Sequence, residues 1–536
     1  MRTSPALRAA ALAVTTTMFL PLTACSDGGD SNGPDGPRNS SPLAANAAES
    51  GSGPGGLASQ KLSWKRCSAP IQAQGGGSAP TPLPDGTPWE CASMKVPLDY
   101  AKPSGETIDL ALIRARAKDR ARRIGSLVFN FGGPGASGVT TLPAFGTAYE
   151  KLRTRYDLVS FDPRGVGASA GVKCETDQQL DAHYQTDQMP DNSSELNDFL
   201  KDAKTFAAAC ERNSGRKLPY VGTTNAARDM DLMRQVLGDK KLTYFGISYG
   251  TQLGGVYAHL FPRNVGRAVL DGVVDPTLDS EQASIGQARG FQLALGNFSK
   301  DCVARGAACK LPGSTPKEVE QGISGLLTRL EQKPVSGLGS RQLTRTLATT
   351  GIAAALYSKS TWPLLEQGVD EADGGNGALL MALADSLNGR SRDGSYDNSM
   401  AANTAISCAD SKQRFTPEQV QARLPAFRAA SPVFGDYLAW GLLTCTGWPV
   451  AGVWKTPDVS APGAAPILVI GNTGDPATPY AGAKAMAREL GEGVGVQMTY
   501  RGQGHGAYNS GDACVQKTVG DYFLNGKVPS AGTVCK

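Results

Sequence analysis

The chain has 536 residues, 40% of them hydrophobic, and a formal net charge of +4 at neutral pH. This length suits one large enzyme core with an insertion, and the hydrophobic fraction is sufficient for a sizeable buried core. The near-neutral charge gives no reason to expect a nucleic-acid partner. With three histidines and no close Cys-x-x-Cys pair, no metal site is expected either.

The N-terminus has the features of an export signal, predicted to comprise residues 1–24. Arg2 and Arg8 precede a mostly apolar run at residues 9–22, which is too short to span a membrane comfortably. The run ends in Leu-Thr-Ala-Cys, which resembles a bacterial lipobox with Cys25 as the lipidated first residue. This implies an outward-facing anchor in the membrane or envelope, with plain secretion as the alternative. Residues 25–60 are Gly-, Ser- and Pro-rich and are interpreted as a flexible tether.

The remaining ten cysteines are an even number, which fits disulfides in an exported protein. We predict that they are structural and pair in sequential order, although ten cysteines permit many other connectivities. The predicted pairs are 67 with 91, 174 with 210, 302 with 309, 408 with 445 and 514 with 535.

Strand and helix signals alternate over residues 61–275 and again over 452–536, which predicts an α/β fold with a mostly parallel sheet and helices on both faces. Helices are expected at residues 225–237 and 251–260. Strands are expected at residues 94–98, 107–117, 126–131, 156–161, 242–245, 268–272, 466–471 and 496–500.

Between residues 276 and 451 the alternation stops. Long helical stretches are predicted at residues 282–295, 316–331 and 351–387, without clear strands. We interpret this region as a helical cap inserted into the α/β core and covering its active site.

Two loops follow predicted strands in the first half of the core. The glycine-rich loop at residues 132–138 offers backbone N–H groups of the kind that stabilise an oxyanion, although a simple tight turn would also need its glycines. The next loop contains Asp162 and Arg164, which we interpret as a buried ion pair rather than as catalytic groups.

Residues 246–250 read Gly-Ile-Ser-Tyr-Gly and lie between an apolar, aromatic strand signal and a helix signal. In this context the Gly-x-Ser-x-Gly pattern predicts a nucleophile elbow, with Ser248 as the nucleophile. An ordinary strand–helix connection is the alternative.

A serine nucleophile needs a base, and histidine is the usual one. His259 lies eleven residues after Ser248 on the same predicted helix, about 16 Å along its axis, and cannot reach the hydroxyl. His183 occurs in a polar stretch and is expected on the surface. His505 lies in a glycine-rich loop directly after the last predicted strand, where the Ser…Asp…His chain order places the base. We therefore predict His505 as the base.

The acid that orients the histidine should lie on a loop at the same edge of the sheet. Asp475, in a tight glycine-bounded loop after the strand at residues 466–471, is the favoured candidate. Asp271 and Asp275, which follow the preceding strand, remain alternatives.

Five motifs together resemble the secreted tripeptidyl aminopeptidases, α/β-hydrolase relatives of the prolyl iminopeptidases with a helical cap. They are N-F-G-G-P-G at 130–135, D-P-R-G-V-G-A-S at 162–169, T-N-A-A-R-D-M-D-L-M-R at 224–234, G-I-S-Y-G at 246–250 and D-P-A-T at 475–478. The similarity runs from about residue 62 to the C-terminus, and the lipobox resembles the envelope-bound members of the group.

The resemblance implies a serine exopeptidase that releases short peptides, typically tripeptides, from free N-termini without a cofactor. It implies a triad of Ser248, Asp475 and His505, with oxyanion donors at the Tyr249 and Gly133 amides. Phe131 departs from the histidine or proline usual at its position, and it is expected to face the oxyanion region and affect substrate preference.

An aminopeptidase also needs groups that bind the substrate ammonium, and the cap offers Glu366, Asp370, Glu371 and Asp373. Two other functions remain open from the sequence. One is a secreted esterase or lipase that uses the same triad, and the other is a non-catalytic envelope lipoprotein that binds a ligand.

Overall fold

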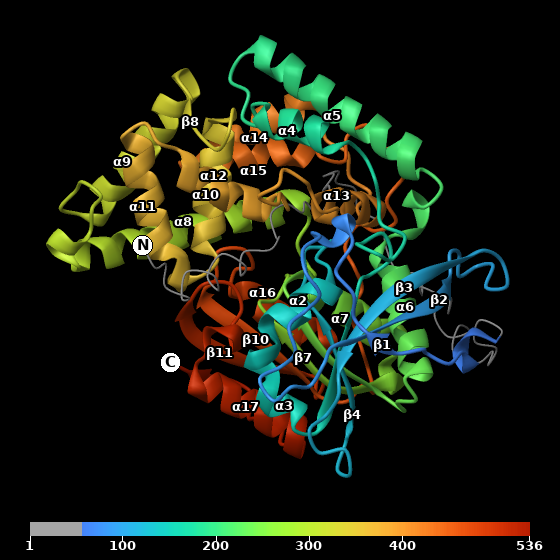
Figure 1. Ribbon diagram of the computed structural model, residues 1–536. Coiled ribbons are helices and arrows are strands. Elements are labelled where there is room, and N and C mark those ends of the chain that lie inside the picture. The colour runs from blue at the N-terminus through green and yellow to red at the C-terminus, as the bar shows by residue number, and fades with distance from the viewer. Residues whose placement is uncertain (1–55) are drawn as a thin grey trace, which may run out of the picture.

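The structure is a computed structural model that describes residues 56–536 (Figure 1). The predicted signal peptide, Cys25 and the tether up to residue 55 lie outside the described residues. The final residues of the predicted tether are folded, since Leu57–Ser59 form the 3₁₀ helix η1 and Leu57 packs against the core. Within residues 56–536, no helix combines the length and the apolar character that a membrane crossing requires.

A ten-stranded sheet forms the centre of the α/β part (Figure 1). Its strands are β1 (Lys65–Arg66), β2 (Glu90–Pro97), β3 (Thr107–Ala115), β4 (Gly125–Asn130), β5 (Tyr156–Phe161), β6 (Leu242–Ile247), β7 (Val265–Asp271), β10 (Ile467–Gly474), β11 (Gly495–Gln503) and β12 (Thr533–Cys535). Their order is β1-β2-β3-β5-β4-β6-β7-β10-β11-β12. The pairs β1–β2, β2–β3 and β3–β5 are antiparallel. The remaining pairs, from β5–β4 to β11–β12 in the sheet order, are parallel.

Helices cover both faces of this sheet because successive strand residues point to opposite faces. In β4, Leu127 and Phe129 belong to the hydrophobic core shared with α2, α3 and α17, whereas Val128 belongs to the core shared with α6, α7 and α16. The helices of the two faces are α2 (Gly138–Phe145), α3 (Glu150–Arg153), α17 (Ala513–Asn525), α6 (Thr223–Val236), α7 (Tyr249–Leu260) and α16 (Ala481–Leu490).

A second, helical layer lies above the sheet in the view of Figure 1. Between β7 and β10 the chain forms α8 (Ser280–Ala304), α9 (Pro316–Gln332), α10 (Arg345–Leu356), α11 (Trp362–Asp373), α12 (Ala378–Leu387), α13 (Ser399–Asp410), α14 (Pro417–Ala430) and α15 (Gly435–Trp440). The earlier helices α4 (Asp177–Gln185) and α5 (Ser193–Ser214) join this layer, and Phe199 of α5 lies in the cap core. Conversely, Ala402 and Ala405 of α13 pack into the α/β core. The cap is therefore built from two separate chain segments.

All eight strands predicted from the sequence are present, with ends shifted by four residues or fewer. The sequence did not predict β1, β12 or the cap hairpin of β8 (Val335–Ser336) and β9 (Gln342–Leu343), since two or three residues are too few to show a period. The stretch at 351–387 contains three helices rather than one. Pro363 opens α11, and Gly374 and Gly375 follow its end, as is typical of helix boundaries.

The five disulfides pair in sequential order, as predicted: Cys67–Cys91, Cys174–Cys210, Cys302–Cys309, Cys408–Cys445 and Cys514–Cys535. Disulfides persist in oxidising compartments, so this framework fits an exported protein.

The prediction that Asp162 and Arg164 form an ion pair is wrong, because the two side chains bind different neighbours. Arg164 forms a bidentate pair with Asp229 of α6 (2.7 and 2.6 Å), and the two side chains are 1% and 0% exposed. Asp162 instead accepts hydrogen bonds at the start of α2, from the Ser137 hydroxyl (2.6 Å) and the Val139 N–H (3.2 Å). A carboxylate is favourable at a helix N-terminus.

Replacing Asp229 should strongly destabilise the fold. Asp229→Asn leaves the buried Arg164 guanidinium without a counter-charge, for which the expected cost is about 3–5 kcal/mol in the free energy of unfolding. Urea denaturation measures it, with Asp109→Asn as the control, because the Lys95–Asp109 pair is 58% and 57% exposed and such pairs contribute about 0–1 kcal/mol. Equal, small losses in both variants would contradict this account.

Candidate active site

Ser248 lies at a sharp turn between β6 and α7. Its backbone has φ 58° and ψ −125°, an unusual conformation for a residue with a side chain, and the residue is 2% exposed. The flanking glycines permit the close packing of the turn, since a Cβ on Gly246 would lie 2.3 Å from the Gly250 carbonyl oxygen. A Cβ on Gly250 would lie 2.6 Å from the Asn130 carbonyl oxygen at the end of β4. This geometry is that of a nucleophile elbow.

His505 and Asp475 are in contact. The His505 Nδ1 atom lies 2.9 and 3.0 Å from the two Asp475 carboxylate oxygens. Asp475 also accepts hydrogen bonds from the N–H groups of Ala477 (3.0 Å), Thr478 (2.9 Å) and Gly506 (3.1 Å), which fix its orientation. The other ring nitrogen, Nε2, is buried and has no hydrogen-bond partner within residues 56–536. An imidazole whose Nδ1 is held by a carboxylate and whose Nε2 is not bonded to another protein group is arranged as a general base.

The serine and histidine loops meet at the end of β7. The Ser248 N–H donates to the Asp271 carbonyl oxygen (3.0 Å). The His505 Cε1 atom lies 3.2 Å from the position that a Cβ on Gly272 would occupy. Ser248 and Asp475 also line the same cavity. The parallel register of β6, β7 and β10 thus brings three loops that are distant in sequence to one edge of the sheet.

The two alternative acids have other partners. The Asp271 carboxylate accepts the N–H groups of Ala507 (2.8 Å) and Tyr508 (2.8 Å), so it ties β7 to the backbone that follows His505. Asp275 accepts the Thr277 N–H (2.9 Å) and hydroxyl (2.7 Å). Sequence reasoning missed Thr478, whose hydroxyl lies 3.2 Å from His505 Nδ1. Thr478 ends the D-P-A-T motif at residues 475–478, but the motif alone assigned it no role, because the contact depends on how its loop folds.

Buried charges surround the imidazole. Burial by itself lowers the pKa of His505, but the charge and hydrogen bond of Asp475, together with the charge of Asp271, outweigh it and raise that pKa above its ordinary value. Burial raises the pKa of Asp271 to about 6, partly offset by its two backbone hydrogen bonds. His505 therefore holds a proton more strongly than a free histidine does.

The glycine-rich loop lies directly against the elbow. A Cβ on Gly132 would lie 2.7 Å from the Ile247 carbonyl oxygen and 2.8 Å from the Ser248 Cβ, closer than a side chain can approach, so this position requires glycine. Gly133 lines the cavity beside Ser248 and Tyr249. Across the described chain, the Gly133 and Tyr249 N–H groups donate no hydrogen bond to protein atoms, so both remain available for an oxyanion.

Helix α13 of the cap supports the backbone on both sides of the elbow. Near its start, the Asn403 amide donates to the Pro134 carbonyl oxygen (2.9 Å), next to Gly133. At its end, Asp410 accepts the Thr223 N–H (2.8 Å) and hydroxyl (2.5 Å), and the Thr223 oxygen lies 2.5 Å from the Tyr249 hydroxyl. The sequence gave no signal for this support because α13 lies about 150 residues beyond the elbow.

A cavity of about 650 Å³ lies beside Ser248, between the core and α8. The cap contributes Gln282, Arg289 and Leu293 of α8 to its walls. The helix passes close to the Asp475 loop, since a Cβ on Gly290 would lie 2.4 Å from the Pro476 carbonyl oxygen. A cavity of this size accepts a substrate of several residues.

The four cap carboxylates considered for ammonium binding do not line this cavity. Glu366 is buried and accepts hydrogen bonds from Arg305 (2.6 Å) and the Lys310 N–H (2.9 Å), which makes it structural. Asp373 pairs with Arg329, and Glu371 accepts from the Gln367 amide (2.7 Å). Asp370 lines a separate pocket with Asp373.

Three other expectations concern aromatic and histidine side chains. Phe131 does not line the Ser248 cavity but stacks between Phe129 (5.9 Å) and Phe145 (6.1 Å). His259 bonds the Ser460 carbonyl oxygen (2.8 Å) at the far end of α7. His183 is only 20% exposed rather than on the surface as expected, because the cap helices cover it.

Among the described residues, two clusters place three metal-ligating side chains together. One contains Cys302, Cys309 and Glu366, and the other contains Asp512, Cys514 and Cys535. In both clusters the cysteines are disulfide-bonded, so they have no thiolate to offer.

The chain resembles several known proteins. Residues 431–535 match a family described as TAP-like protein. The chain is 37% identical over 461 residues to serine protease Hip1 of Mycobacterium tuberculosis, covering 83% of this chain and 87% of that protein. It is 36% identical over 459 residues to carboxylesterase B of the same species (83% and 86%). It is 33% identical over 458 residues to tripeptidyl aminopeptidase of Streptomyces lividans (84% and 84%).

Because the sequence contains three histidines, the pKa of the His505 imidazole can be followed separately by NMR. In NMR of protein labelled at histidine, we expect the His505 imidazole to titrate above pH 6.5, the ordinary value. Asp271→Asn should lower that pKa, because a nearby negative charge favours the imidazolium. Asp458→Asn, beside His259, is the control and should leave the His505 signal unchanged. An unchanged or higher His505 pKa in Asp271→Asn would contradict the assigned cause.

Proposed function

The chain belongs to the tripeptidyl aminopeptidase-like family of α/β-hydrolases and is a serine hydrolase, and from this premise we propose that it is an exopeptidase that removes tripeptides from free N-termini. The observation that carries the proposal is the arrangement of His505. Asp475 holds its Nδ1 atom, and its buried Nε2 atom has no hydrogen-bond partner among the described residues. Both residues lie at the same edge of the sheet as the Ser248 elbow. The relative from Streptomyces lividans is named for this activity.

In the proposed mechanism the Ser248 hydroxyl oxygen attacks the scissile carbonyl carbon while His505 Nε2 accepts the hydroxyl proton. The resulting oxyanion accepts hydrogen bonds from the Tyr249 and Gly133 N–H groups. His505 then gives the proton to the leaving amine, and the C–N bond breaks to leave an acyl-enzyme. Water attacks this ester with His505 again as base, which releases the peptide acid and restores Ser248. Asp475 stabilises the imidazolium in both halves.

The described disulfides fit an exported protein, and we propose that the chain is anchored outside the cell through a lipid on Cys25. The motif at residues 22–25 supports this anchor. Peptides and proteins of the extracellular space would then be its substrates, and the membrane its attachment surface.

A second candidate function is hydrolysis of carboxylic esters by the same triad. The 36% identity to a protein named carboxylesterase B favours keeping it under test. An esterase of simple acyl groups would need no group that binds a substrate ammonium.

The two functions differ in what Ser248 acts on. We expect purified protein to release the chromophore from a free tripeptidyl anilide and not from its N-acetylated form. Ser248→Ala should lower kcat by about 10⁴-fold or more, because the covalent step is lost. Ser194→Ala, on the exposed start of α5, is the matched control and should retain full activity. Fast turnover of a simple ester without any anilide cleavage would replace the peptidase by the esterase.

The support of the oxyanion loop by α13 is also testable. Asn403→Asp keeps the side-chain shape but places a carboxylate oxygen, which cannot donate, against the Pro134 carbonyl oxygen. We expect kcat to fall by about tenfold or more, with a smaller change in KM, since the donors act on the transition state. Asn376→Asp, an exposed position in the cap, controls for the added charge. A rise in KM alone would show that Asn403 acts on substrate binding instead.

A further inference from the structure

The cavity beside Ser248 is bounded on one side by α8, which crosses three strand ends of the sheet. The helix begins after the loop that follows β7. Further along, the Gln287 amide donates to the Ala477 carbonyl oxygen (3.3 Å), beyond the end of β10. The Asn297 amide then donates to the Gln503 side chain (2.9 Å) at the end of β11. This wall of the cavity is therefore fixed relative to the loops that carry the catalytic acid and base.

Three charged side chains are present among the described residues that line this cavity. Asp475 is the acid of the triad and binds His505. The other two are Asp275, in the loop between β7 and α8, and Arg289 of α8. Arg289 is exposed and forms no hydrogen bond or ion pair with residues 56–536. The cavity thus offers a cationic substrate group one carboxylate that the triad does not use, and an unpaired guanidinium repels that group elsewhere.

The Asp275 carboxylate is half-buried and has a fixed orientation. Its Oδ1 atom accepts hydrogen bonds from both the N–H (2.9 Å) and the hydroxyl (2.7 Å) of Thr277. Its Oδ2 atom accepts none within the described part of the chain. An ionised carboxylate has two acceptor oxygens, so Thr277 holds the group in place and leaves Oδ2 available. This oxygen can accept a charge-assisted hydrogen bond from an ammonium group.

Asp275 lies near the nucleophile because Thr251 joins the two segments. The Thr251 hydroxyl donates to the Ser248 carbonyl oxygen (2.6 Å) and accepts the Val274 N–H (3.0 Å). With standard backbone dimensions, these two bonds place the Asp275 Cα atom no more than about 11 Å from the Ser248 carbonyl oxygen. Three extended residues span about 10 Å. A peptide of three residues can therefore reach from Ser248 to Asp275.

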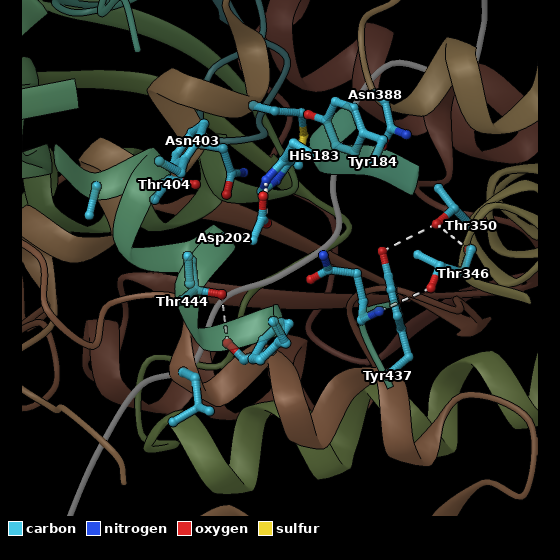
Figure 2. Close-up of a pocket in the computed structure, with 18 of the residues that line it drawn as sticks. His183, Tyr184, Asp202, Thr346, Thr350, Asn388, Asn403, Thr404, Tyr437 and Thr444 are labelled. Carbon is cyan, nitrogen blue, oxygen red and sulfur yellow. Dashed lines mark hydrogen bonds and ion pairs between the residues drawn. The ribbon is translucent and has the colours of Figure 1, made fainter. Parts of the chain in front are cut away.

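The smaller cavity within the cap is not this site. It has a volume of about 130 Å³ and shares no lining residue with the cavity of Ser248. Its one carboxylate, Asp202, is paired with His183, with 2.7 Å between the Asp202 Oδ2 and His183 Nδ1 atoms (Figure 2). The group that binds the substrate amine is therefore expected in the cavity that contains the nucleophile.

We propose that Asp275 binds the N-terminal ammonium of the substrate and thereby restricts cleavage to peptides with a free N-terminus. The inference rests on the proposed exopeptidase activity and deepens it, since it assigns the group that recognises the amine. Arg289 favours the same orientation of the substrate, because it repels the ammonium from its own part of the cavity. Asp275 thus takes the role for which the four cap carboxylates named above lie outside the cavity.

The test measures peptide binding separately from peptide cleavage. A chromogenic acetyl ester reports turnover by Ser248, and a free tripeptide and its N-acetylated form compete as inhibitors. In the unaltered protein the free form should inhibit at least about tenfold more strongly, the effect of one charge-assisted hydrogen bond. Asp275→Asn should abolish this ratio, because it keeps the Oδ1 acceptor for Thr277 and removes the charge. Asp370→Asn, at an exposed position of α11 outside the cavity, is the matched control and should retain the ratio.

A second variant narrows the cavity without changing a charge. A Cβ on Gly286 of α8 would meet no atom within 4 Å, so the side chain of Gly286→Leu enters the cavity. Leucine also favours the helix more than glycine does, so this variant serves if Asp275→Asn does not fold. Both peptide forms should lose their inhibition of Gly286→Leu. A covalent fluorophosphonate counts the functional active sites in every preparation.

The inference is overturned if Asp275→Asn keeps the unaltered ratio or if both peptide forms inhibit the unaltered protein equally. It is also overturned if Asp370→Asn abolishes the ratio instead, or if Gly286→Leu remains fully inhibited by both peptides. Failure of the proposed exopeptidase activity appears separately, as absence of anilide cleavage by unaltered protein that still discriminates the two inhibitors.

Discussion

The backbone of Ser248 is held at a positive φ that an isolated serine would rarely adopt. Such a conformation costs about 1–3 kcal/mol and persists only where the surroundings over-determine it. Here β6 and α7 determine it from within the chain, and Gly132 and Asn130 from the neighbouring strand end. The Ser248 N–H also bonds the end of β7. The reacting oxygen is thereby held at the buried ends of β6, β4 and β7, and the other catalytic groups are placed relative to it.

A second constraint is electrostatic. Asp475 and Asp271 are both buried near His505, and each is satisfied mainly by backbone N–H groups. Because these donors are fixed, the two carboxylates hold the histidine loop in place as well as setting its charge. The two carboxylates have different contacts. Asp475 binds the His505 imidazole, and Asp271 binds the backbone that follows His505. Both acids raise the pKa of His505, so one local field serves orientation and basicity together.

The cap is more than a cover for the site. Helix α13 holds the loops that carry both expected oxyanion donors, and α10 holds His505 through the Tyr357 carbonyl oxygen. The same helices, together with α5, enclose the smaller cavity. In this arrangement the positions of the catalytic loops depend on the cap helices, because the cap packs into the core instead of resting on it. The disulfide Cys408–Cys445 fixes α13 covalently to the end of the cap.

The sequence by itself determined the α/β fold and the helical stretch between β7 and β10, and it identified Ser248 and His505 as candidates, with Asp475 favoured over Asp271 and Asp275 as the acid. Each depends on local information: a period of two or 3.6, glycines at fixed spacing around Ser248, and one histidine of three in a loop after a strand. The sequential pairing predicted for the cysteines is also present, and every disulfide closes a stretch of 37 residues or fewer, although the sequence left other connectivities open. Only the tertiary structure decided that Arg164 pairs with Asp229, that α4 and α5 join the cap, and that His183 is covered. It also showed that Asp475, and not Asp271, contacts the His505 imidazole, and that α13 lies against the elbow. These contacts join segments from 30 to more than 260 residues apart, and side-chain pairing over such distances leaves no periodic trace in the sequence.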